Sequence, residues 1–352
     1  MKTRKILALA LAAAVTLSLL SACSGKQNTP GSSSQAPGNA SQSQPQVPSG
    51  SASEPEDDED YTTGDASLDN PRNQDGIGET ELLVVSFGTS FNDNRRLTIG
   101  AIEEAMEQAF PGYSVRRGFT AQIVIDHIQR RDGEVIDNVT QALDRAVDNG
   151  VKTLIVQPTH LMNGFEYNDV VDEVAQYADA FDEIIMGAPL LTSDEDFQIV
   201  AQAMVDATAQ YDDSKTAICF MGHGTEAESN AIYAKMQKVL TDGGHTNYFV
   251  GTIEAEPSLD TVLELVKAGS YEKVILQPMM IVAGDHANND MAGDDEDTWK
   301  TAFEGAGYQV ECVLKGLGEY EAIQQLLVDC QRRYEIVRKR RRNFVVFRRR
   351  GG

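Results

Sequence analysis

A short internal repeat constrains the fold of this chain more than any other feature of its sequence. The run LLVVSFGTS at 82–90 recurs as AICFMGHGTE at 217–226, and LIVQPTHLMNGFEY at 154–167 recurs as VILQPMMIVAGDHA at 274–287. Each run is apolar at first and then turns to glycine and polar residues, which is typical of a buried parallel strand that ends in a loop. The repeat therefore predicts two similar halves.

From residue 81 onward, strand-like runs alternate with amphipathic helical stretches, as in a parallel sheet covered by helices. We expect strands at 81–86, 113–117, 152–157, 183–187, 215–221, 247–253, 272–277 and 308–314. We expect helices at 94–109, 120–131, 137–149, 166–178, 194–210, 228–241, 258–268, 289–305 and 319–334. The fold class is therefore α/β, with halves at 77–200 and 201–331, and a cleft between their sheets is the expected ligand site.

The N-terminal part of the chain is predicted to direct export and not to fold. Residues 1–22 combine a basic start, an apolar stretch and a Leu-Ser-Ala-Cys box, which predicts a lipoprotein signal peptide with Cys23 as the lipid attachment site. A plain signal peptide or a short membrane anchor are the alternatives. Residues 23–76 are rich in Ser, Gln and Pro and then acidic, which predicts a disordered linker. We therefore expect an extracytoplasmic protein held at the membrane by lipid.

Charge is unevenly distributed along the chain. The net charge is −24, yet residues 331–352 hold ten Lys or Arg against one Glu. The acidic body argues against nucleic-acid binding and favours attraction of cations, so that a polyanionic ligand needs a local basic patch. We expect residues 332–352 to form a disordered basic tail, with binding to an anionic membrane surface or a reading-frame artefact as alternatives.

Two of the five histidines fall in corresponding loops of the second half. His223 stands in MGHG, where the first half has Phe87, and His286 stands in AGDH, where the first half has Glu166. Neutral imidazole binds Co, Ni, Fe(II) or Zn and also accepts a proton near neutral pH. Glu254, at the end of the strand between them in sequence, can add a carboxylate oxygen, with an ordinary exposed acid as the alternative.

Several common catalytic patterns are missing from the sequence. It contains no phosphate-binding P-loop, no dinucleotide-binding glycine pattern after the first strand and no G-x-S-x-G elbow, so nucleotide use and serine hydrolysis have no support. No Cys-x-x-Cys spacing occurs, and Cys219 and Cys312 lie within apolar strand patterns, where they are best explained as buried hydrophobic residues. The acidic GDDED run at 293–297 predicts a solvated loop or helix start.

A series of motifs in order resembles one enzyme family. The motifs are VVSFGTS, RDG, QPTHLMNGFEY, APLL, MGHG, VGTIE, MIVAGDHANNDMAGDDEDTWK and GLGE, within residues 81–331. They resemble the sirohydrochlorin cobaltochelatases of anaerobic cobalamin synthesis, which belong to the class II chelatases. The resemblance implies two flavodoxin-like halves and insertion of Co²⁺, with Fe²⁺ or Ni²⁺ as alternatives. It further implies that His223, Glu254 and His286 hold the metal, that the two histidines are catalytic, and that no other cofactor is needed.

The implied tetrapyrrole substrate carries many carboxylates, so basic residues must receive it. Arg117 and Arg131 are the candidates, with surface solubility as the alternative role for each. The opposite wall of the cleft is expected to contain Phe87, Gly88, Thr89, Ser90, His160, Asn163 and Gly164. A core or loop-capping role is the alternative for His160.

The predicted lipid anchor places the protein outside the cytoplasm, whereas sirohydrochlorin is made and used inside the cell. The alternative function is therefore an extracytoplasmic protein that binds or transports a tetrapyrrole such as haem, or a metal, on the same fold. A homo-oligomer is compatible with the sequence.

Overall fold

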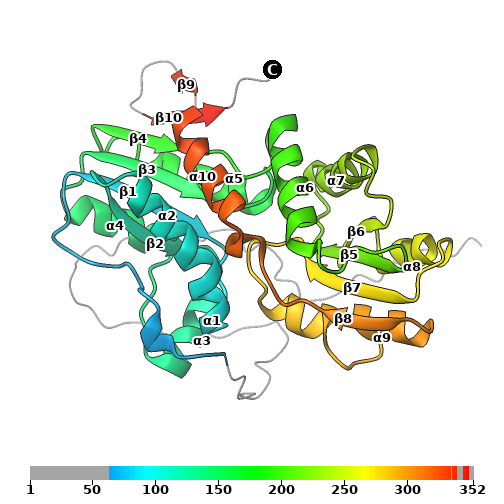
Figure 1. Ribbon diagram of the computed structural model, residues 1–352. Helices are drawn as coiled ribbons and strands as arrows, with labels where there is room; N and C mark the ends of the chain where they lie inside the picture. The colour runs from blue at the N-terminus through cyan, green and yellow to red at the C-terminus, as the bar shows by residue number, and fades with distance from the viewer. Residues whose placement is uncertain (1–62, 334, 339–343, 349–352) are drawn as a thin grey trace, which may run out of the picture. The chain divides into compact units, whose positions relative to one another are not determined.

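The computed structural model describes residues 63–333, 335–338 and 344–348 (Figure 1). The predicted signal peptide, the predicted lipid site Cys23 and the linker up to residue 62 lie outside the described residues. Within the described part of the chain, no helix is both long enough and apolar enough to cross a membrane.

Eight strands form two parallel sheets with the same strand order, β2-β1-β3-β4 in the first half and β6-β5-β7-β8 in the second. The strands are β1 (Thr80–Ser86), β2 (Ser114–Phe119), β3 (Thr153–Pro158), β4 (Glu183–Met186), β5 (Thr216–Gly222), β6 (Tyr248–Thr252), β7 (Lys273–Pro278) and β8 (Gln309–Cys312). β1 and β5 are buried almost throughout because each is flanked by a strand on both sides and covered on both faces. The sequence repeat is thus a repeat of sheet topology, and the predicted α/β fold class is confirmed.

Helices connect the strands and cover the sheets (Figure 1). They are η1 (Ala66–Leu68), α1 (Asn92–Arg95), η2 (Arg96–Gly100), α2 (Ala101–Ala109), α3 (Gln122–Asp132), α4 (Val139–Asp148), α5 (Phe165–Gln176), α6 (Asp194–Thr208), η3 (Glu228–Asn230), α7 (Ala231–Asp242), α8 (Leu259–Lys267), η4 (Ala287–Met291), α9 (Trp299–Gly305), η5 (Leu317–Glu319) and α10 (Glu321–Arg333). α4 shows why these segments are helical. Asn138 caps its N-terminus in a capping box, and its apolar residues recur on one buried face.

One hydrophobic cluster is shared by the two halves. It contains Leu82 and Val84 of β1 together with Ile218 and Phe220 of β5, and both α6 and α10 contribute to it. α10 returns to the first half, where it packs against α2 as well as against α6. The predicted boundary between residues 200 and 201 is not a boundary in the structure, because it falls inside α6.

Residues 63–76, which we predicted to be disordered linker, belong to the fold, and we call them the N-terminal strap. The side chains of Asp69 and Arg72 in this strap are only 2% and 5% exposed. Arg72 pairs with Glu103 at 3.2 Å. The linker prediction is wrong here because polar composition indicates disorder only where the polar groups stay in water, and these are paired inside the protein.

The C-terminal segment predicted to be disordered at 332–352 contains two strands. β9 (Glu335–Arg338) and β10 (Phe344–Arg348) pair antiparallel, and β10 adds in parallel to the edge strand β4. The first sheet therefore extends to β2-β1-β3-β4-β10-β9. The prediction is wrong for these residues because the runs EIVR and FVVF have β-branched and aromatic side chains that favour strands, which the surrounding arginines obscured.

The helix predicted at 289–305 is interrupted. Its first part is a single π-helical turn, η4, and α9 begins only after a loop. The side chain of Thr298 caps α9 by accepting a hydrogen bond from the backbone N–H of Thr301 at 3.2 Å. The acidic run at 293–297 is the loop between the two, as predicted, and its four acidic side chains are exposed.

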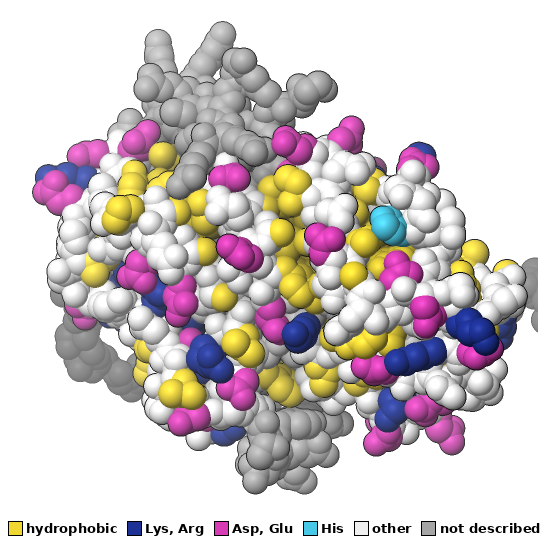
Figure 2. Space-filling view, in the orientation of Figure 1, with side chains coloured by type: hydrophobic (Ala, Val, Ile, Leu, Met, Phe, Trp, Pro, Cys, Tyr) yellow, Lys and Arg dark blue, Asp and Glu magenta, His cyan; other side chains and the backbone are white. Residues whose placement is uncertain are grey.

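Charged side chains are mixed on the molecular surface. On the face shown in Figure 2, acidic side chains lie over both halves, and basic side chains lie among them, often beside an acidic one. Lys238 and Asp242 form such a pair at 2.6 Å, and Lys300 and Asp294 form another at 2.6 Å. Exposed pairs of this kind add little stability, so their main effect is on the electrostatic field around the protein.

Candidate functional site

The strand order reverses at the same point in both sheets, and ligands of open α/β sheets bind beyond the strand ends at such a point. In the second half the reversal lies between β5 and β7. His223 directly follows β5, and His286 lies in the loop that follows β7. The centroids of the two imidazole rings are 4.6 Å apart, and the ring planes cross at 78°. The structure thus brings the two predicted histidines together.

His223 is held by a short hydrogen-bonded loop. Its Nδ1 lies 3.0 Å from the carbonyl oxygen of Gly224. A carbonyl can only accept, so in the neutral ring Nδ1 carries the proton and Nε2 keeps the lone pair. Gly224 has a φ of +90°, and a Cβ there would lie 2.9 Å from the backbone nitrogen of Ala255, so the turn requires glycine. The backbone N–H of Glu254 donates to the carbonyl of His223 at 2.9 Å and joins the loops after β5 and β6.

His286 is oriented by an acidic side chain one helical turn later. Its Nδ1 lies 2.7 Å from Oδ2 of Asp290 in η4, and the carboxylate can only accept, so in the neutral ring Nε2 again keeps the lone pair. A carboxylate behind a histidine fixes the ring and makes its other nitrogen a stronger ligand. Asp290 was not among the predicted site residues, although its spacing of four residues from His286 on one turn is a readable signal.

Glu254 lies beside the histidine pair. Its Oε2 is 3.6 Å from Nδ1 of His223, and 56% of its side chain is exposed. Among the residues that the structure describes, no three His, Cys, Asp or Glu side chains form a group that could hold a metal ion. The ligand set of two histidines and one glutamate therefore stays a prediction, and it requires Glu254 to turn toward the pair, which its exposure permits.

Glu166 approaches the pair from the first half. Partial burial raises the pKa of Glu166, while the charge of His223 acts in the opposite direction, so Glu166 lies within electrostatic range of His223. Oε2 of Glu166 also lies 3.7 Å from Nε2 of His160. Burial lowers the pKa of His160 to about 4, and neither of its ring nitrogens has a hydrogen-bond partner within the described ranges. His160 is therefore neutral near pH 7. Glu166 was noted in the sequence only as the repeat counterpart of His286.

The loop after β1 forms the first-half side of the same region. Phe87 is 45% exposed and lines a cavity of about 270 Å³ together with Phe119 and Glu166. Gly88 has a φ of +105°, and a Cβ there would lie 2.6 Å from the Phe119 ring, so this turn also requires glycine. Thr89 is buried beneath the loop. Of the residues predicted for this wall, Phe87 is thus the one that presents a large side chain to the cavity.

The other candidates of this wall have mainly structural contacts. Asn163 is exposed, and the carbonyl of Gly164 accepts from the backbone N–H of Asn168 at 3.1 Å at the start of α5. Arg131 donates from Nη2 to the carbonyl of Ser90 at 2.6 Å, and 24% of its side chain is exposed. Arg131 therefore holds the loop after β1, and a contact between Arg131 and a substrate stays a prediction.

Arg117 is not available to a substrate. It is fully buried in β2, and its guanidinium donates at 2.7–3.1 Å to the carboxylates of Glu103 and Asp69. The prediction that Arg117 receives a substrate carboxylate is wrong, because its buried guanidinium is already paired with two carboxylates of the protein itself. Neighbouring strand residues point to opposite faces, and here both faces of β2 are covered, so Arg116 is buried as well.

Solved structures share the fold. SirB from Bacillus subtilis with Fe³⁺ matches with a TM-score of 0.50 and 12% identity, over 72% of this chain and 95% of that chain. The sirohydrochlorin chelatase SirB from Bacillus subtilis subspecies spizizenii in complex with cobalt matches with a TM-score of 0.50 and 13% identity, over 72% and 94%. At such low identity the likeness concerns the fold, which is that of the class II chelatases, as predicted.

Sequence comparison defines the family. The profile described as cobalt chelatase (CbiK) matches residues 80–333. The sirohydrochlorin cobaltochelatase of Salmonella typhimurium is 36% identical over 247 residues, which are 70% of this chain and 93% of that protein. The sirohydrochlorin cobaltochelatase CbiKC of Nitratidesulfovibrio vulgaris is 30% identical over 267 residues, 75% of this chain and 94% of that protein. The chain belongs to the cobalt chelatase (CbiK) family and is an enzyme of that class.

Proposed function

We propose that the protein inserts Co²⁺ into sirohydrochlorin, on the anaerobic route to cobalamin, with the histidine pair at the centre of its site. The observation that carries this proposal is the approach of His223 and His286, whose ring centroids are 4.6 Å apart. In both rings Nδ1 faces an acceptor, so both Nε2 atoms are left for a metal ion or a proton. The names of the two relatives support the choice of reaction.

The metal substrate would bind between the two imidazoles, with Glu254 as the third ligand. Imidazole nitrogen and carboxylate oxygen suit Co²⁺, and they also suit Fe²⁺ and Ni²⁺, so metal availability contributes to selection. Insertion does not change the oxidation state of the metal, and the ring supplies the final nitrogen ligands. We therefore expect no resident cofactor beside the metal substrate.

Metal insertion also releases the pyrrole protons of the macrocycle, so the site needs acceptors close to the ring. Nε2 of either histidine can accept a proton, and the carboxylate of Glu166, whose pKa is raised by burial, can hold another. The exposed face of Phe87 beside the cavity suits a flat aromatic ring. When the site holds the metal ion, the macrocycle and the proton acceptors close together, insertion no longer depends on their separate diffusion and becomes an effectively unimolecular step.

The test is an assay of Co²⁺ insertion into sirohydrochlorin by the full mature chain, in which the absorption spectrum of the macrocycle reports the reaction. We expect His223→Ala and His286→Ala each to lower kcat/KM by about 100-fold or more, the scale of a lost acid–base or ligand group. His245→Ala is the matched control, because His245 contacts Tyr248 at the start of β6. It therefore lies at the amino-terminal ends of the strands, whereas the histidine pair lies beyond their carboxyl-terminal ends. Wild-type rates in both site variants would contradict the proposed site.

We also propose that the protein acts outside the cytoplasm, held to the membrane through a lipid on Cys23. This location favours the alternative function of binding a tetrapyrrole such as haem, or a metal, without turnover. Titration with haem, and separately with sirohydrochlorin plus Co²⁺, distinguishes the two functions. Catalytic turnover of many equivalents supports the enzyme, whereas saturation at one equivalent with no metal insertion supports the carrier.

A further inference from the structure

The N-terminal strap is tied to the loop that follows β1. The backbone carbonyl of Thr63 accepts from the N–H of Asp93 at 2.7 Å, and the carbonyl of Gly64 accepts from the side-chain amide of Asn92 at 3.3 Å. Both bonds join the strap to α1, the short helix directly after this loop. The strap precedes the part of the chain that matches the family profile, which begins at residue 80.

Asp69 of the strap is the shared counter-ion of two buried arginines. Its carboxylate lies 2.6 Å from Nε of Arg95 and 2.7 Å from Nη1 of Arg117, and both guanidinium groups are fully buried. Burial alone would raise the pKa of Asp69, but the hydrogen bonds from Arg117 and Arg95 lower it below its ordinary range. Asp69 is therefore ionised, and without it two buried cations would compete for the remaining carboxylates.

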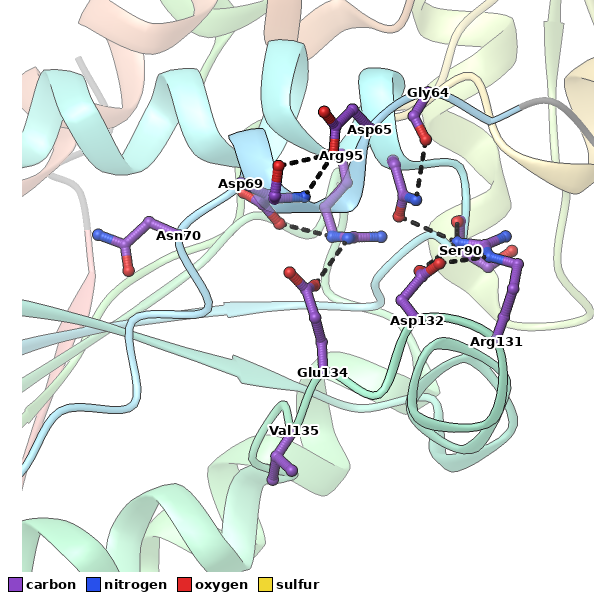
Figure 3. Close-up of polar contacts among 12 residues, drawn as sticks. Gly64, Asp65, Asp69, Asn70, Ser90, Arg95, Arg131, Asp132, Glu134 and Val135 are labelled. Carbon is purple, nitrogen blue, oxygen red and sulfur yellow. Dashed lines mark hydrogen bonds and ion pairs between the residues drawn. The ribbon is translucent and has the colours of Figure 1, made fainter.

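Arg95 carries this interaction to the site. Figure 3 shows its guanidinium between Asp69 and Glu134, which it contacts at 2.6 Å and 3.2 Å. Its Nη1 donates to the backbone carbonyl of Thr89 at 3.2 Å. The side chain of Thr89 in turn lies next to Gly284, where an added Cβ would lie 2.9 Å from the Thr89 Oγ1. Gly284 is two residues before His286.

The residue next to Arg95 provides a second connection to the same loop. Oδ1 of Asn94 accepts from the backbone N–H of Ala283 at 2.8 Å, and its Nδ2 donates to Glu319 at 3.4 Å. Ala283 lies three residues before His286. Because Arg95 and Asn94 belong to one short helix, a change in the position of this helix moves both supports of the histidine loop.

We propose that Asp69 is a positioning residue for cobalt insertion, acting through Arg95 and α1 to hold the loop that carries His286. The inference rests on the proposed function, in that it takes His286 to be a group of the active site. It makes the strap a part of the catalytic unit, although the strap lies outside the segment that defines the family.

The experiment compares Asp69→Asn with Arg72→Gln in the full mature chain. Arg72→Gln is the matched control, because it removes another buried ion pair of the strap, that with Glu103, without touching Arg95. Co²⁺ affinity in the absence of macrocycle and the kinetics of insertion into sirohydrochlorin are both measured, at a temperature where circular dichroism shows each variant to be folded.

For Asp69→Asn we expect Co²⁺ affinity and kcat/KM to fall about tenfold, the scale reported for partners that orient metal ligands. We expect Arg72→Gln to retain both values. Adding Arg95→Gln to Asp69→Asn should cause no further loss, because both changes break one path. Wild-type affinity and rate in Asp69→Asn, or equal losses in Arg72→Gln, would overturn the inference.

Should Asp69→Asn fail to fold, Arg95→Lys replaces it. This variant keeps a cation opposite Asp69 but shortens the reach to the carbonyl of Thr89, so the same loss of Co²⁺ affinity is expected, and an unchanged affinity overturns the inference. His286→Ala is measured alongside. If His286→Ala is inactive while Asp69→Asn is normal, only the role of the strap is refuted, whereas an active His286→Ala refutes the proposed site itself.

Discussion

Glu81 makes the stability of this protein depend on pH in an unusual direction. Its carboxylate is fully buried in β1, and neither oxygen has a hydrogen-bond partner within the described part of the chain. The nearest guanidinium nitrogen, Nη1 of Arg116, is 3.7 Å away, too far for a hydrogen bond. Burial raises the pKa of Glu81 to about 7, with Arg116 opposing the rise and Asp137 adding to it.

The sign and size of the effect follow from this pKa. The folded protein holds the Glu81 proton more tightly than the unfolded chain, so the free energy of unfolding falls as the pH rises from the ordinary pKa of 4.5 to about 7. The difference between these pKa values corresponds to a total loss of about 3 kcal/mol, of which about 2 kcal/mol falls between pH 5 and pH 7. The contribution levels off about one pH unit above the folded pKa.

Glu81→Gln tests this reasoning, because glutamine has nearly the shape of the protonated acid and does not titrate. We expect the variant to be more stable than the wild type by about 3 kcal/mol at pH 8, and by under about 1 kcal/mol at pH 5. The assay is urea unfolding of both proteins at several pH values, followed by circular dichroism. A stability difference that does not change with pH, or a wild type that is the more stable protein at pH 8, would refute the argument.

Two further predictions concern the site and the sheet edge. Asp290→Asn should weaken Co²⁺ binding about tenfold, because the 2.7 Å contact that orients His286 loses its negative charge. Titration with Co²⁺ alone measures this affinity, and an unchanged value would show that the His286 ring does not need the carboxylate. Removal of residues 334–352 should leave insertion unchanged but uncover the edge of β4, and light scattering should then detect association between chains. A variant that stays in the same assembly state as the full chain would show that β4 needs no cover.

Much of the fold could be predicted because it depends on local patterns. The runs before Phe87 and His223 are apolar and are followed by glycine, and such runs have few alternatives to a buried parallel strand. The helix predicted at 289–305 shows the limit of this approach. Its periodicity continues across the acidic loop, whereas the break depends on the cap at Thr298 and on the cost of burying adjacent carboxylates.

Features that depend on long-range pairing could not be predicted. Asp69 and Arg117 are far apart in sequence, and each by itself resembles a surface residue, so nothing local indicates that they meet inside the protein. The same holds for the site. His223 and His286 could be placed because each follows a predictable strand, but the approach of Glu166 from the other half depends on how the two sheets pack together.

The hydrophobic cluster that joins β1 to β5 has a consequence for how a large, flat molecule enters and leaves. Any hinge motion that separated the sheets would bring Leu82, Phe220 and the apolar side of α10 into water, which is energetically unfavourable. Movements of the loops around the two imidazoles leave that cluster intact. Substrate exchange is therefore expected to depend on movement of these loops while the two sheets stay packed together. Stiffening of the loops would then slow release of the metallated macrocycle.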